Sequence, residues 1–291
     1  MGRFLDLTLA GLTSGAVYAA VALALVLIWR STRIVNFALG GMMITTFLGY
    51  TVVSHGGSYW LALAVAIAAG LVLGAVVERV LIRPVAKRPP LDAVVVTFGL
   101  LVGLQGIAGM VFGGTPQSYP PAFSIAGFQV GGRQILFSPN DLWIVGVVLA
   151  VMVVLAAVFR RTSAGLRMRA TAFAPEVARL LGVRVGRMLT VGWALDAVVG
   201  AVAGVLIAPS TFVSPTAFDA VLVFGFTAAV IGGLDSPPGA VVGGVALGVV
   251  LSFVSGYLGP DIVTLGALVV LIVVLMVRPH GLFGAGARRR V

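Results

Sequence analysis

The sequence predicts an all-α integral membrane protein, built as a polytopic helical bundle of about eight to nine transmembrane helices. Three observations lead to this fold class. Of the 291 residues, 60% are hydrophobic and only 10% are charged, which is far less charge than a soluble domain of this length carries. Several apolar runs exceed about 18 residues, the length at which a helix can cross a membrane. The basic residues lie between these runs and follow only some of them.

The first apolar run continues to Trp29. It is too long for the apolar core of a cleaved signal peptide, so we expect a retained first span. Eight further apolar segments follow. If 34–53 or 217–234 is re-entrant, the number of spans falls to eight. The segments in chain order are 7–29, 34–53, 58–78, 91–113, 141–159, 188–208, 217–234, 239–258 and 261–277.

The basic residues assign the two sides of the membrane. If the spans alternate, every Lys and Arg except Arg3 and Arg133 lies on one side. Positive charge stays in the cytoplasm, so we expect the N-terminus outside and the C-terminus in the cytoplasm. This topology explains the net charge of +10 without nucleic-acid binding. The inner residues are Arg30, Arg33, Arg79, Arg83, Lys87, Arg88, Arg160, Arg161, Arg167, Arg169, Arg179, Arg184, Arg187, Arg278, Arg288, Arg289 and Arg290.

Two connections between predicted spans are long enough to form structure outside the bilayer. The outer one, 114–140, is rich in Gly, Pro, Ser and aromatic residues, and is expected to form a cap or a docking surface. The inner one is 160–187. Since no other stretch of length leaves the bilayer, the sequence predicts a single membrane domain over 1–291.

Glycines recur at four-residue spacing in several predicted helices. This spacing places both glycines on one helix face and lets a neighbouring backbone approach closely. We expect tight helix packing at these positions, with sliding of helices past one another as a second interpretation. The pairs are Gly11/Gly15, Gly99/Gly103, Gly109/Gly113, Gly200/Gly204, Gly239/Gly243 and Gly244/Gly248.

The inner connection contains APEVARLLG (174–182), which predicts a short helix. Pro175 suits the first helical position, Glu176 complements the positive N-terminus, and Gly182 suits the stop. The helix is too short to span a membrane. It either rests on lipid headgroups or docks on a cytoplasmic partner. Val177, Leu180 and Leu181 fall on one face, and Glu176 and Arg179 tend to the other.

Asp235 and Ser236 stand in a Gly- and Pro-rich break at 232–239. Prolines and clustered glycines cannot continue a straight helix, and they leave backbone groups without helical partners. Within a membrane this is tolerated where the backbone lines a polar path. The break is therefore either part of a translocation path or a plain cytoplasmic turn between two spans.

Three further polar residues are candidates for lining a path. Asn36 lies in RIVNFALGG (33–41), as a half-helix entry or as a helix cap. Asp196 sits inside the predicted span 188–208, where a carboxylate is costly and normally faces a partner or a water-filled path. Thr97 adds weaker polar lining.

No catalytic or metal site is expected. The chain has no cysteine, and its two histidines, His55 and His280, are far apart. It contains no G-x-x-x-x-G-K-[ST] phosphate loop, so it does not hydrolyse ATP by that route. No cofactor is predicted.

The sequence resembles the permease subunits of ABC importers, specifically the LivH-type branched-chain amino acid family. Glu176-Val177-Ala178-x-x-x-Gly182 is similar to the E-A-A-x-x-x-G signature of the coupling helix, with one conservative change and with Arg179, Leu180 and Leu181 between. The I-x-L-P extension of that signature is missing. Similar stretches in family order are R-x-x-N-F-A-x-G from Arg33, RATAFAPEVARLLGV (169–183), G-G-x-x-S-x-x-G-A from Gly232 and RPHGLFG (278–284).

The resemblance implies a single ABC-importer transmembrane domain with a cytoplasmic coupling loop at 160–187, in the inner membrane of a bacterial cell. It implies a second related permease, two ATPase subunits and an extracytoplasmic substrate-binding protein as partners, besides membrane lipid. The implied substrates are branched-chain or similar small apolar amino acids. The alternatives are urea or short amides as substrates, an ATP-independent secondary carrier, and a non-transporting scaffold.

Overall fold

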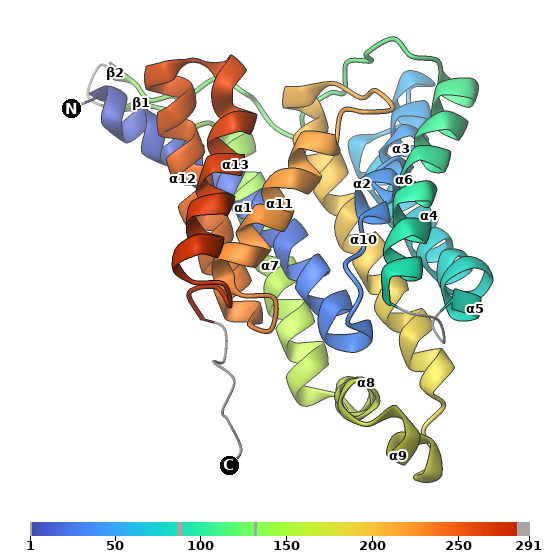
Figure 1. Ribbon diagram of the computed structural model, residues 1–291. Coiled ribbons are helices and arrows are strands. Elements are labelled where there is room, and N and C mark those ends of the chain that lie inside the picture. Colours follow the sequence, from blue (N-terminus) through green and yellow to red (C-terminus); the bar gives the residue numbers. More distant parts are fainter. Residues whose placement is uncertain (1, 86–89, 131–132, 284–291) are drawn as a thin grey trace. The chain divides into compact units, whose positions relative to one another are not determined.

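The computed structural model describes residues 2–85, 90–130 and 133–283 (Figure 1). Lys87, Arg88 and the arginines at 288–290, which the charge pattern placed inside, lie outside the described residues, as does Gly284 of the C-terminal motif.

Within the described residues, seven helical segments are long and apolar enough to cross a membrane, which confirms the predicted polytopic helical class. Most are single helices. The second runs through the π-helix η1 (Glu78–Ile82) into α5 (Arg83–Val85), and the last begins with the short 3-10 helix η2 (Pro260–Ile262). The main helices are α1 (Gly2–Thr32), α4 (Tyr59–Val77), α6 (Pro90–Phe112), α7 (Pro139–Arg161), α10 (Val185–Thr211), α12 (Pro237–Leu258) and α13 (Val263–Val277).

Two predicted spans are shorter, and they are the two for which the sequence allowed a re-entrant path. The first is broken into α2 (Ala38–Met42) and α3 (Thr45–Ser54). The second is α11 (Asp219–Gly232), whose 14 residues make a helix of about 21 Å. A hydrocarbon core is about 30 Å thick.

The helices form two compact units, each assembled from separated parts of the chain. One unit takes the described residues of 1–26, 121–150 and 220–291, and the other takes those of 27–120 and 151–219. The connection 114–140 contributes a small antiparallel hairpin to the first unit, made of β1 (Gln129–Val130) and β2 (Arg133–Gln134).

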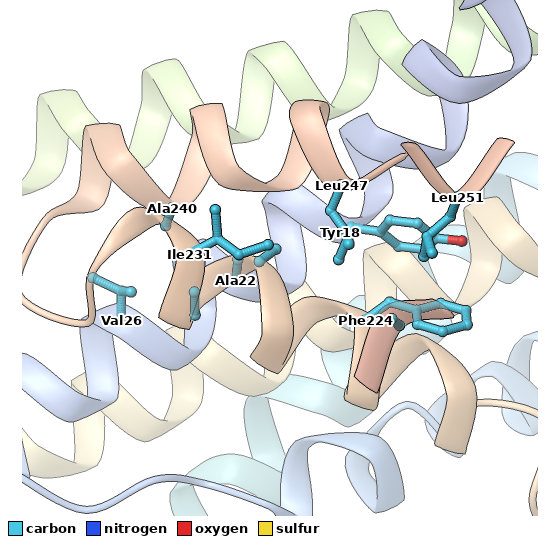
Figure 2. Close-up of a cluster of buried hydrophobic side chains, with 11 residues drawn as sticks. Tyr18, Ala22, Val26, Phe224, Ile231, Ala240, Leu247 and Leu251 are labelled. Atoms are coloured by element: carbon cyan, nitrogen blue, oxygen red, sulfur yellow. The ribbon is translucent and has the colours of Figure 1, made fainter. Parts of the chain in front are cut away.

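The first unit is held together by α1, α11 and α12. Its apolar core gathers side chains from these helices around Tyr18 and Phe224, whose ring centroids lie 5.1 Å apart (Figure 2). The predicted glycine pairs of α1 and α12 allow direct backbone contact, because a Cβ at Gly15 would lie 2.9 Å from the Cα of Val245. This confirms the close packing expected there.

The second unit is organised around the contact between α4 and α10. A Cβ at Gly70 would lie 2.9 Å from the carbonyl oxygen of Ala197, and one at Gly74 would lie 2.9 Å from the Cα of Ala194. An adjacent face of α10 receives the broken segment, since a Cβ at Gly204 would lie 3.2 Å from the carbonyl oxygen of Met43. The helix α10 therefore packs against both α4 and the α2–α3 segment.

The predicted inner helix is present as α9 (Pro175–Leu180), and it is preceded by α8 (Ser163–Phe173), which the sequence did not predict. Figure 1 shows α8 and α9 as two short helices between the end of α7 and the start of α10. Thr162 caps α8, because its hydroxyl accepts a hydrogen bond from the backbone N–H of Gly165 at 3.1 Å.

The close contact at Gly74 generates a stability prediction. Both Gly74→Ala and Gly103→Ala gain helix propensity, worth about 1 kcal/mol in a helix interior. At Gly74 the new methyl group meets the backbone of α10, whereas no described atom lies within 4 Å of a Cβ at Gly103. Overpacking of this kind costs about 1–3 kcal/mol. Gly74→Ala should therefore lower the thermal unfolding midpoint of the detergent-solubilised chain while Gly103→Ala does not; equal midpoints would refute the packing argument.

Candidate functional site

The helix α10 carries a carboxylate into the interior of its unit. Asp196 has no exposed surface, and its neighbours Trp193 and Ala197 are also fully buried. It lies on the stretch of α10 that is enclosed by α4 and the α2–α3 segment. A carboxylate in such a position is costly unless polar groups compensate it. The polar groups that compensate Asp196 therefore define this site.

Asp196 is paired with Asn36, from the segment between α1 and α2. Its side-chain Nδ2 donates a hydrogen bond to Oδ2 of Asp196 at 2.6 Å, and Asn36 is itself fully buried. The N-cap residue of α2 is Phe37, with no side-chain capping bond, so Asn36 does not serve as the helix cap that one interpretation foresaw. The two residues are 160 positions apart in the chain.

Thr97 lies next to this pair. It is fully buried on α6, and its hydroxyl lies 2.9 Å from the carbonyl oxygen of Val94 and 3.4 Å from that of Val35. The second contact ties α6 to the residue before Asn36. The structure thus brings three of the sequence-predicted path residues into one neighbourhood.

Each residue of the buried pair has one acceptor oxygen that receives no hydrogen bond from the described residues. Oδ1 of Asn36 and Oδ1 of Asp196 are both buried without a hydrogen-bond partner among the described residues. No ion pair found in the described part of the chain includes Asp196. Buried acceptors that lack donors cost free energy, and a ligand or water that supplies N–H or O–H groups recovers it. The arrangement is suited to a donor-rich group such as an ammonium or an amide.

The other two predicted path residues belong to the other unit and form a turn. The helix α11 ends at Gly232, Gly233 has a positive φ of 95°, and α12 begins at Pro237. The hydroxyl of Ser236 caps α12 by accepting from the N–H of Gly239 at 3.1 Å, and Asp235 is exposed. This is the turn that the simpler interpretation of the break expected.

A second candidate site is the exposed face of α9. Leu180 is 89% exposed and Leu181 is 79% exposed, and Val177 is exposed as well, while Ala178 is the buried residue of this helix. Glu176 and Arg179 form an exposed ion pair at 3.2 Å. The predicted apolar face therefore points away from the rest of the protein.

The end of α9 is fixed by its own backbone. Gly182 has a φ of 80°, and its N–H donates to the carbonyl of Arg179 at 3.0 Å. The N–H of Val183 donates to the carbonyl of Ala178 at 2.9 Å. This pair of bonds is the Schellman arrangement, in which glycine is favoured because L side chains are strained at positive φ.

Sequence reasoning missed a second buried carboxylate in the same unit. Glu78 is buried and is paired with Arg83. The signal available in the sequence was a lone Glu at the end of an apolar run, followed five residues later by Arg. Its position beside a cluster of basic residues is typical of an ordinary interfacial charge.

Comparison with known proteins matches almost the whole chain. A family described as "Branched-chain amino acid transport system / permease component" matches residues 7–277. The high-affinity branched-chain amino acid transport system permease protein LivH of Escherichia coli K12 is 29% identical over 97% of this chain and 96% of its own length. BraD of Pseudomonas aeruginosa is 28% identical over the same shares. A probable LivH of Methanocaldococcus jannaschii is 26% identical over 91% of this chain and 87% of its own length. No solved structure matches the chain.

The Asn36–Asp196 contact generates a second stability prediction. Asn36→Ala leaves the buried carboxylate without its donor, which costs about 1–3 kcal/mol. Asn36→Ala combined with Asp196→Ala removes both polar groups, so the double variant should lose less stability than the sum of the two single variants. Thermal unfolding midpoints of the four proteins measure this coupling. Additive losses would show that the two side chains do not interact.

Proposed function

Because the chain belongs to the family of permease components of branched-chain amino acid transport systems, we propose that it is a permease subunit of an ATP-driven ABC importer. It forms part of the path by which branched-chain or similar small apolar amino acids cross the inner membrane of a bacterial cell. It acts as one multi-pass membrane domain, with its N-terminus outside, its C-terminus in the cytoplasm and its coupling loop at 160–187.

The observation that carries this proposal is the uncovered apolar face of α9. Val177, Leu180 and Leu181 are exposed on a short helix that is held by its own cap. Arginines surround it, including the exposed Arg184 and Arg187 just beyond Gly182. Apolar side chains on a short, firmly capped helix are suited to a cleft in a partner protein. In this proposal residues 176–182 dock on the ATPase and receive its motion.

The energy source is supplied by partners. The sequence has no phosphate loop, so the proposal assigns ATP hydrolysis to two separate ATPase subunits. A second, related permease completes the path, and an extracytoplasmic binding protein delivers the substrate. The relatives LivH and BraD are described as permease proteins of high-affinity transport systems, which supports a subunit role of this kind.

The path residues are proposed from the buried polar site. Asn36, Thr97 and Asp196 lie together, with two acceptor oxygens that lack donors among the described residues. The α-ammonium group of an amino acid offers three N–H donors and a positive charge, which match a carboxylate and an amide oxygen. Urea and short amides also offer N–H donors, and they remain the alternative substrates. Asp235 and Ser236 are proposed as path residues of the other unit.

The proposal is tested by ATP-driven uptake. In proteoliposomes that contain this permease, its partner permease and the ATPase subunits, labelled leucine delivered by a binding protein should accumulate only when ATP is supplied. Excess isoleucine or valine should compete, whereas urea should not. The lone chain should accumulate nothing. Uphill accumulation by the lone chain would overturn the proposal in favour of a secondary carrier, and competition by urea alone would favour the alternative substrates.

A surface substitution on α9 tests the coupling role. Leu180→Asp should lower ATP-driven uptake by about tenfold or more, because an apolar anchor in a protein interface commonly contributes about 2 kcal/mol. The level of permease in the membrane should not change, since Leu180 is 89% exposed. Leu282→Asp is the matched control, at an exposed leucine outside the coupling loop. Uptake that survives Leu180→Asp unchanged would mean that α9 does not dock on the ATPase.

A further inference from the structure

The inner end of α4 contains an unusual turn with a buried carboxylate. Residues Glu78–Ile82 form a π-helix, and the backbone N–H of Arg83 donates to the carbonyl of Glu78. In an α-helix, side chains five residues apart point about 140° away from each other. The wider π turn brings residues 78 and 83 onto the same side. Such turns are rare and often occur at functional sites.

Arg83 forms a fork on this carboxylate. Its Nε donates to Oε1 of Glu78 at 3.0 Å, and its Nη2 lies 2.8 Å from Oε2. The Glu78 side chain is 1% exposed, whereas that of Arg83 is 44% exposed. Two parallel bonds of this kind are the strongest and most direction-specific form of an ion pair. The guanidinium reaches the buried carboxylate from a partly exposed position.

The fork also holds the first turns of α10. The hydroxyl of Thr190 donates to Oε2 of Glu78 at 2.6 Å, and Nη2 of Arg83 lies 2.9 Å from the carbonyl oxygen of Gly186 and 2.9 Å from the Thr190 hydroxyl. A Cβ at Gly186 would lie 3.3 Å from the guanidinium carbon. Glu78, Arg83, Gly186 and Thr190 therefore form one network, which we call the inner clamp, between the end of α4 and the start of α10.

The inner clamp lies between the two candidate sites along the chain. Gly186 follows Gly182, the stop of α9, by four residues, and Asp196 lies six residues beyond Thr190, about 9 Å along the helix. Further along, α4 and α10 are in backbone contact at Gly70 and Gly74. The hydrogen bonds of the clamp and these backbone contacts both oppose sliding or rotation of α10 against α4.

We propose that Glu78 and Arg83 are positioning residues for coupling. They join the inner ends of α4 and α10, so that a displacement of α9 moves both helices together and reaches the Asn36–Asp196 site. This inference rests on the proposed function. The competing explanation is a staple that only stabilises the fold, and it predicts lost stability without lost coupling.

The test measures substrate transported per ATP hydrolysed by the assembled transporter in proteoliposomes. The variants are Arg83→Lys, which keeps the charge but loses the fork, and the double variant Glu78→Gln with Arg83→Gln, which leaves no unpaired charge. Transport per ATP should fall by about fivefold or more, the lower end of ordinary coupling between distant sites. The ATPase activity itself should persist.

Ser58→Ala is the matched control, because Ser58 caps the other end of α4 by accepting from the N–H of Leu61 at 3.2 Å. It should lower the unfolding midpoint and leave transport per ATP unchanged. If the clamp variants also lower only the midpoint, the inference is overturned. If the double variant does not assemble with its partner subunits, transport per ATP and the unfolding midpoint of Arg83→Lys alone decide between the two explanations. A wild-type transporter without ATP-driven uptake would overturn the proposed function, and the inference with it.

Discussion

The backbone contact between α4 and α10 is the constraint on which the second unit depends. At Gly70 and Gly74 the two helices approach so closely that a single methyl group would meet backbone atoms. Such proximity is the main source of helix association in a membrane, where apolar side chains gain little by leaving lipid. Because α10 is held on this side, its adjacent face is fixed against α2 and α3. The positions of the polar side chains that α10 carries into the unit therefore depend on this contact.

Two buried carboxylates in this unit differ in how many of their oxygens accept hydrogen bonds, and the difference agrees with the two roles proposed for them. Both oxygens of Glu78 accept hydrogen bonds, from Arg83 and Thr190. Among the described residues, Asp196 accepts a hydrogen bond at Oδ2 alone, from Asn36. A fully satisfied buried network makes a structure rigid, whereas a partly satisfied one leaves free energy to be gained by a ligand. The network around Glu78 therefore suits a rigid connection between two helices, and Asp196 suits a group that binds a ligand.

Sequence patterns predicted the features that depend on local chemistry. The apolar runs, the costly Asp196 and the cap at Gly182 could each be recognised within a short window. The partner of Asp196 could not, because Asn36 lies 160 residues away and the sequence was equally consistent with a helix cap. Glu78 was missed because a carboxylate beside arginines is normally solvated, and its burial and its pairing with Arg83 depend on a π turn and on packing against α10. The pair Gly70/Gly74 has the same spacing as the predicted pairs but was not singled out.

The cap of α9 determines which residues of this helix can change in sequence without disturbing the end of the helix. The two bonds that end this helix use only backbone groups of Ala178, Arg179, Gly182 and Val183. The side chains of Val177, Leu180 and Leu181, which are exposed, therefore take no part in this cap. Substitutions at these three positions can accumulate while the cap keeps the end of the helix in place. If α9 docks on the ATPase as proposed, duplicated copies of the gene can diverge in the ATPase that they bind while their membrane helices stay the same.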